Sequence, residues 1–79
     1  MDFFESNIQL SLLITLFKHN GLKIEVFNST KDAYVNISYE TRLVTYPFKN
    51  VTEANSFGNY LINTYLNEGP SIEEFFNKL

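Results

Sequence analysis

The fold is decided by residues 22–48, LKIEVFNSTKDAYVNISYETRLVTYPF, where apolar and polar side chains alternate in three short segments. Alternation with a period of two is typical of β-strands that bury one face. The segments run from Leu22 to Phe27, from Ala33 to Glu40 and from Leu43 to Phe48. Their connections are short and polar, which favours antiparallel pairing of sequential strands. We therefore expect a three-stranded antiparallel meander.

The alternation also predicts which side chains face the core. The inward set is apolar and aromatic: Leu22, Ile24, Val26, Ala33, Val35, Ile37, Tyr39, Val44, Tyr46 and Phe48. The outward set mixes charged, polar and aromatic residues: Lys23, Glu25, Phe27, Tyr34, Asn36, Ser38, Glu40, Leu43 and Thr45. Because Pro47 cannot donate a backbone hydrogen bond, the third strand is expected to lie at an edge or to end there.

Helices are expected on both sides of these strands. A first helix is predicted from Ser6 to His19, because Ser6 and Gln9 form a capping box and Asn20-Gly21 supplies a left-handed stop. Its polar residues form one narrow stripe, so most of its circumference is apolar and needs cover.

The second helix is predicted to start at Asn50, with Glu53 at the capping-box position, and to end at 68–70. Its apolar stripe has helical spacing and comprises Ala54, Phe57, Gly58, Leu61, Ile62 and Tyr65. Glycine weakens a helix interior by up to about 1 kcal/mol relative to alanine, so Gly58 indicates a close backbone approach. Ser71 and Glu74 begin a short third helix, whose apolar face comprises Ile72, Phe75, Phe76 and Leu79. The predicted fold class is α+β, in the order α-β-β-β-α-α, with helices on one sheet face and residues 1–79 as a single domain.

The chain contains few residues that could perform catalysis. It has 79 residues with no cysteine and one histidine, which excludes a disulfide framework and a structural zinc site. His19 is the ordinary candidate for a general base, but its place in the last turn of the predicted first helix is explained by the helix dipole. No phosphate-binding loop, metal-ligand cluster or nucleophile motif is present. We expect no enzymatic activity, no cofactor and no bound metal.

The charge pattern argues for a protein partner. Nine acidic and six basic residues give a net charge of −3, and no two of the basic residues are adjacent. Proteins that bind nucleic acid cluster their Lys and Arg to neutralise phosphates, so direct binding to a nucleic-acid backbone is not expected. An acidic surface suits a basic partner, including the nucleic-acid-binding face of another protein. The acidic N-terminus and the lack of a long apolar run favour a cytoplasmic protein that does not enter a membrane.

Two surfaces are candidates for the partner. On the outer sheet face, Phe27, Tyr34 and Leu43 are expected to act as anchors, although one face of an antiparallel sheet is often simply solvated. The other candidate surface is formed by acidic residues on the predicted turn and helices: Glu40, Glu53, Glu68, Glu73 and Glu74. The sequence leaves open which of the two forms the interface. The surplus of apolar residues is also consistent with a homodimer.

Two families share parts of this layout. From Ser6 to Asn67 the α-β-β-β-α order resembles a double-stranded-RNA-binding domain, but residues 50–54, NVTEA, carry no basic residue where that family has its Lys-rich motif. In size, acidity and α-β-β-β-α-α order the whole chain is similar to small phage proteins that inhibit CRISPR nucleases. That resemblance implies that the acidic residues named above cover a basic nucleic-acid-binding surface of a host protein.

These observations favour a small, non-enzymatic protein-binding module, of the type by which phages or mobile elements inhibit a host protein that handles nucleic acid. It would then act in the host cytoplasm. The alternative is a structural or homo-oligomeric adaptor without an inhibitory role. A third hypothesis is single-stranded nucleic-acid binding by the sheet face, which Glu25 and Glu40 oppose.

Overall fold

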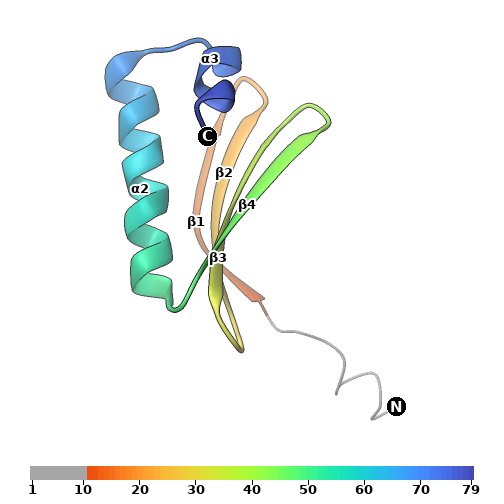
Figure 1. The fold of residues 1–79 in the computed structure, drawn as a ribbon, viewed down its shortest axis with the longest axis vertical. Coiled ribbons are helices and arrows are strands. Elements are labelled where there is room, and N and C mark those ends of the chain that lie inside the picture. Colours follow the sequence, from red (N-terminus) through yellow and green to blue (C-terminus); the bar gives the residue numbers. More distant parts are fainter. Residues whose placement is uncertain (1–10) are drawn as a thin grey trace.

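The computed structural model describes residues 11–79, which form an α+β fold of one antiparallel sheet and two helices (Figure 1). The strands are β1 (Ser11–His19), β2 (Leu22–Ser29), β3 (Ala33–Tyr39) and β4 (Arg42–Phe48), and the helices are α2 (Val51–Glu68) and α3 (Ile72–Asn77). The four strands lie in the order β1-β2-β3-β4 and every neighbouring pair is antiparallel. The sheet is therefore a simple meander, with β1 and β4 at its edges.

The predicted first helix is wrong for residues 11–19, which form strand β1; its start, with the Ser6–Gln9 capping box, lies outside the described residues. The element order is β-β-β-β-α-α, with four strands where we expected three. The conformation of Asn20-Gly21 explains why residues 11–19 form a strand and not a helix. Both residues have positive φ, 50° and 89°, as a two-residue type I′ hairpin requires. The same dipeptide can end a helix, and here it joins two strands.

A strand is also the better physical solution for this segment. Residues 12–17, LLITLF, are apolar on nearly every side, and such a short run is equally compatible with a helix and with a strand by periodicity alone. Pairing with β2 provides hydrogen-bond partners for a long stretch of backbone, and the register runs from Ser11↔Ser29 to His19↔Leu22. The register shifts between Leu13 and Thr15, which indicates a β-bulge at Ile14.

The three strands predicted from alternation are confirmed, and so are their faces. Six inward side chains of β2 and β3 have no exposed surface: Leu22, Ile24, Val26, Ala33, Val35 and Ile37. The inward residues of β4 are only partly buried because this strand is at an edge, away from the centre of the helical layer. The core therefore lies over the two central strands.

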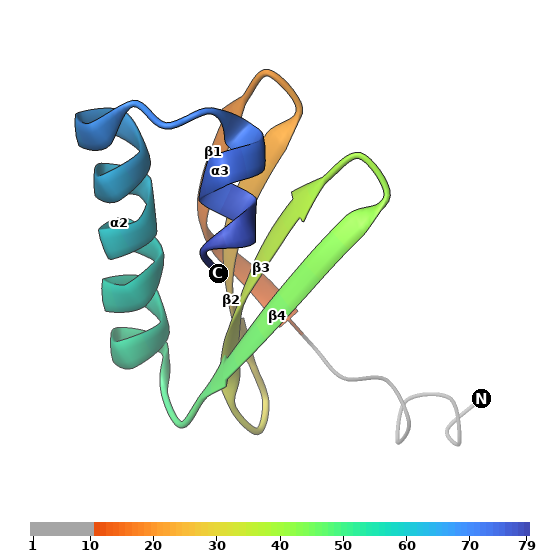
Figure 2. The same cartoon turned by 45° about the horizontal axis from the view of Figure 1, so that its top comes forward.

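Helix α2 packs across the central strands on the inward face (Figures 1 and 2). Its ends are where predicted: Asn50 caps the first turn by accepting a hydrogen bond from the Glu53 backbone N–H, and Gly69 ends the helix at φ 61°. The Glu53 side chain does not return a bond to Asn50, so the predicted capping box is only half formed. The predicted close approach at Gly58 is confirmed. A Cβ at this position would lie 2.5 Å from Cγ2 of Val26, so only glycine lets the helix backbone come this near to β2.

Helix α3 closes one end of the same core. Ser71 and Glu74 form the predicted capping box, and Phe75 and Phe76 are buried. The Phe75 ring packs edge-on against Tyr65 of α2, with ring centroids 5.3 Å apart. Both helices contribute to one hydrophobic cluster with the inward sheet face, so no described element covers the opposite face. Within residues 11–79, no helix is long and apolar enough to cross a membrane.

The Gly58→Ala substitution tests this packing. Although alanine favours helix formation, its methyl group would force α2 and β2 apart, and we expect a loss of about 1–3 kcal/mol in the free energy of unfolding. Chemical denaturation measures the loss. Ser56→Ala, at an exposed position of α2, is the control and should change stability by less than about 0.5 kcal/mol.

A second substitution, at Val26, tests whether contact with this side chain causes the loss of stability. In the Val26→Ala/Gly58→Ala double variant the added methyl takes the space of the Cγ2 methyl, one of the two that Val26→Ala removes, so the two effects should be strongly non-additive. Additive losses, or a neutral Gly58→Ala, would contradict the close contact.

Candidate functional site

The outer sheet face carries a row of apolar side chains. Residues that pair across strands share a face, so the register places Leu13, Phe27, Tyr34 and Pro47 side by side across all four strands. We call these four residues the apolar row. The rings of Phe27 and Tyr34 stack, with centroids 5.1 Å apart and planes 23° from parallel. The Tyr34 hydroxyl donates a hydrogen bond to Oγ of Ser11 over 3.3 Å, which orients the ring.

The rest of the outer face is more polar. The next row comprises Leu16, Glu25, Asn36 and Thr45, and the last comprises Lys18, Lys23, Ser38 and Leu43. In the middle row Thr45 donates a 2.7 Å hydrogen bond from Oγ1 to Oδ1 of Asn36. The structure thus brings two of the predicted anchors, Phe27 and Tyr34, into contact. Leu43 is 62% exposed on the same face, but the polar middle row separates it from them.

Strand β1 adds apolar surface that the sequence did not predict as a site. Leu12, Leu13, Ile14 and Leu16 are between 44% and 67% exposed. These residues were not predicted as a site because their sequence also fits a helix, in which they would be covered. The Asn20-Gly21 pair between two apolar runs is the signal that could have identified them as strand residues.

The five acidic candidates are placed on separate parts of the molecule. Glu40 lies in the β3–β4 turn, whereas Glu53 and Glu68 lie in the first and last turns of α2. Fifteen residues of helix separate those two glutamates by about 22 Å along the axis. The remaining two are in the first turn of α3, where both already have partners. The structure does not bring the five together on one surface.

The partners of the α3 acids are structural. Glu74 accepts hydrogen bonds from the backbone N–H and hydroxyl of Ser71, as a capping-box residue does. Glu73 forms an ion pair with Arg42 over 2.8 Å, but the Arg42 side chain is 37% exposed and that of Glu73 61% exposed, so the pair adds at most about 1 kcal/mol. The Arg42 guanidinium also lies 4.8 Å from the Phe76 ring centroid, a cation–π contact that ties β4 to α3.

His19 lies at the end of a strand, so our explanation of it by a helix dipole is wrong. Its ring is 5.6 Å from that of Tyr65, centroid to centroid, and Nδ2 of Asn20 lies 3.1 Å from its Nε2. The side chain is exposed. Across residues 11–79 no three His, Cys, Asp or Glu side chains are grouped so as to hold a metal ion.

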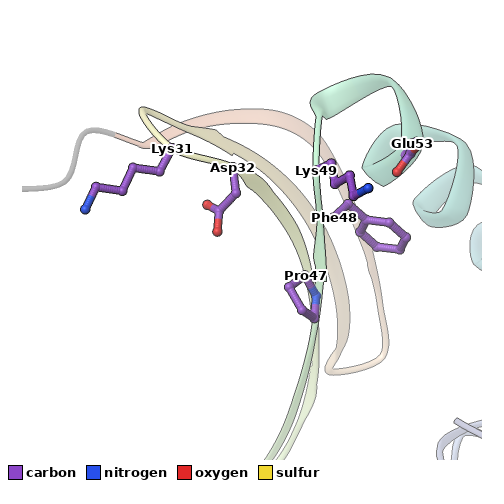
Figure 3. A pocket seen from close by; sticks show the side chains of 6 residues that line it. All are labelled: Lys31, Asp32, Pro47, Phe48, Lys49 and Glu53. Atoms are coloured by element: carbon purple, nitrogen blue, oxygen red, sulfur yellow. The ribbon is translucent and has the colours of Figure 1, made fainter.

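A shallow, open depression lies between the β2–β3 loop and the start of α2 (Figure 3). It is lined by Lys31, Asp32, Pro47, Phe48, Lys49 and Glu53. The labelled side chains do not converge: the amino group of Lys31 points away from that of Lys49 (Figure 3). The depression therefore lacks the concave, convergent polar groups that a small-molecule site needs.

Comparison with known proteins adds no relative. The chain matches no family model, no curated protein and no solved structure. The observed element order also differs from the α-β-β-β-α-α order on which the two resemblances partly rested. The likeness to phage inhibitors therefore rests on size and acidity alone.

Glu40 has a backbone conformation that glutamate seldom adopts. Its φ is 56°, in the left-handed region, where a Cβ is sterically unfavourable. We expect Glu40→Gly to stabilise the protein by up to about 1 kcal/mol, because glycine relieves this strain. Thermal denaturation measures the effect.

The neighbouring turn residue is the matched control. Thr41 does not have positive φ, so Thr41→Gly should lower stability by about 0.4–1 kcal/mol through the entropy of the unfolded chain. If Glu40→Gly instead lowered the melting temperature, the glutamate side chain would stabilise the fold by more free energy than its backbone strain costs, which would contradict the prediction.

Proposed function

We propose that this protein is a non-enzymatic protein-binding module and that the outer sheet face is its binding surface. The observation that carries the proposal is the stacked Phe27–Tyr34 pair within the apolar row, on the sheet face that neither helix covers. Aromatic residues at the centre of an uncovered patch are the usual anchors of protein interfaces, because they bury a large area at a small entropic cost.

The composition of the face favours a protein over a nucleic acid. Its charged residues are Lys18, Lys23 and Glu25, so cations and an anion are mixed within a small area. A strand of nucleic acid needs a continuous path of positive charge beside its stacking platform. Here Glu25 lies in the row between the aromatic pair and the two lysines, where it would repel a phosphate backbone.

The more specific form of the proposal is that the partner is a host protein that handles nucleic acid, and that the module inhibits it in the host cytoplasm, as a phage or mobile-element product would. Support comes from the small size and the net charge of −3, which favours association with a basic protein. Within residues 11–79, Glu40, Glu53 and Glu68 are exposed and form no ion pair, so they contribute to the acidic field that attracts such a partner.

Tyr34→Ala and Tyr60→Ala form a matched pair that tests the surface. Tyr34 lies in the apolar row, whereas Tyr60 is 63% exposed on α2, on the helical side of the molecule. The wild-type protein is used to capture a partner from cells that carry its gene, and titration calorimetry then compares the variants with that purified partner. Tyr34→Ala should raise Kd at least tenfold, which corresponds to about 1.4 kcal/mol, and Tyr60→Ala less than about twofold.

Equal effects of the two substitutions would contradict the outer face as the binding surface. A mobility shift with single-stranded nucleic acid at low salt, together with loss of that shift in Tyr34→Ala, would favour the nucleic-acid hypothesis instead. Melting curves of both variants exclude unfolding as the cause of any loss.

A further inference from the structure

Within residues 11–79 only β2 pairs with β1, and the other edge of β1 is interrupted only by the bulge at Ile14 and the charge of Lys18 near its end. An edge strand presents unpaired N–H and C=O groups, and natural proteins usually interrupt such an edge with charge, proline or a very short strand. Strand β1 is nine residues long, and residues 11–17, SLLITLF, include neither a charge nor a proline. The other edge differs: in β4, Pro47 removes a donor and Arg42 carries a charge. The two edges of this sheet are therefore unequal.

The faces of β1 follow from its pairing with β2. Leu13 and Leu16 pair with Phe27 and Glu25 on the outer face, whereas Leu12 and Phe17 pair with Asn28 and Ile24 on the inner face. The bulge at Ile14 is what places two leucines only three residues apart on the same face. Strand β1 thus exposes apolar side chains on both of its faces, and a strand that pairs with it has to be apolar on both faces too.

We propose that β1 pairs with β1 of a second copy, in antiparallel orientation, across a two-fold axis at Thr15. With the bulge at Ile14 left unpaired, this register places Leu13 against Leu16 of the partner on the outer face. On the inner face it places Leu12 against Phe17 of the partner. Each exposed leucine of β1 then packs against an apolar side chain, and inner and outer faces match across the junction.

Charge favours this orientation. The one charged residue of β1, Lys18, lies near its end, and the antiparallel register places that residue beside Ser11 of the other copy. A parallel pairing would instead place the two Lys18 side chains side by side, which is unfavourable. The strand is therefore complementary to itself in one orientation only.

The helices leave room for such a dimer. Strands β1 of both copies would lie between the two β2 strands, which places the β2 strands about 14 Å apart at the usual strand spacing. A helix with its side chains is about 10 Å wide, and α2 packs over β2 and β3, so the two α2 helices do not collide. The two sheets become one continuous sheet whose outer face carries two copies of the apolar row. This inference does not depend on the proposed function of that face.

Single cysteines test the register, because the chain has no cysteine of its own. Leu13→Cys and Leu16→Cys proteins are prepared separately, then mixed and oxidised. Facing residues in an antiparallel pair have Cα atoms about 4.5–5.5 Å apart, within the range that a disulfide spans. We expect disulfide-linked dimers in the mixture, at more than about tenfold the amount formed by either variant alone at the same total concentration.

Leu43→Cys is the control, since Leu43 is 62% exposed on the outer face of the opposite edge strand. It should form no more dimer with Leu16→Cys than random collision gives. Sedimentation velocity provides the second measurement, and we expect the wild-type protein to form a concentration-dependent dimer. Leu16→Lys should raise the dissociation constant of this dimer at least tenfold, whereas Leu43→Lys should leave it unchanged. A wild-type protein that stays monomeric at high micromolar concentration, a dimer insensitive to Leu16→Lys, or cross-linking without preference for the 13–16 mixture would each overturn the proposal.

Discussion

The contact between Gly58 and Val26 determines how the two layers of this molecule fit together. The α2 backbone comes so near to β2 that a single added carbon atom would lie 2.5 Å from the valine methyl. This approach places the helix over the two central strands, whose inward side chains are completely buried. The edge strands receive less cover, and the outer sheet face receives none from the described elements.

The distribution of apolar surface follows from this arrangement. A chain of 79 residues without a disulfide depends on its apolar core for stability, yet four large aliphatic side chains of β1 remain between 44% and 67% exposed. Monomeric proteins seldom leave such residues contiguous, because burying each one in an interface is favourable by about 25 cal/mol per Å². The stacked aromatic pair lies beside these residues on the outer face. We therefore propose association through this surface: through the face, through the edge or through both.

Most of the fold could be predicted from local chemistry. Alternation identified β2, β3 and β4 and their inward faces, and caps at Asn50, Gly69 and Ser71 marked the ends of both helices. The failure at residues 11–19 has a definite cause: the segment is apolar on all sides, so its period is uninformative, and Asn20-Gly21 is compatible with both a helix stop and a hairpin. The site was predicted only where it depends on alternation, as for Phe27 and Tyr34. The contribution of β1 depends on its pairing register, and the pairing of Glu73 with Arg42 depends on tertiary packing, so neither could be predicted.

A nuclear Overhauser spectrum of the isotopically labelled protein tests the central contact most directly. If α2 lies against β2 as described, the Hα protons of Gly58 give strong cross-peaks to the γ-methyl groups of Val26, since the Gly58 backbone lies against this side chain. Absence of these cross-peaks in a folded sample, with Gly58 accessible to solvent, would contradict the account of how the helical layer leaves one sheet face and one edge uncovered.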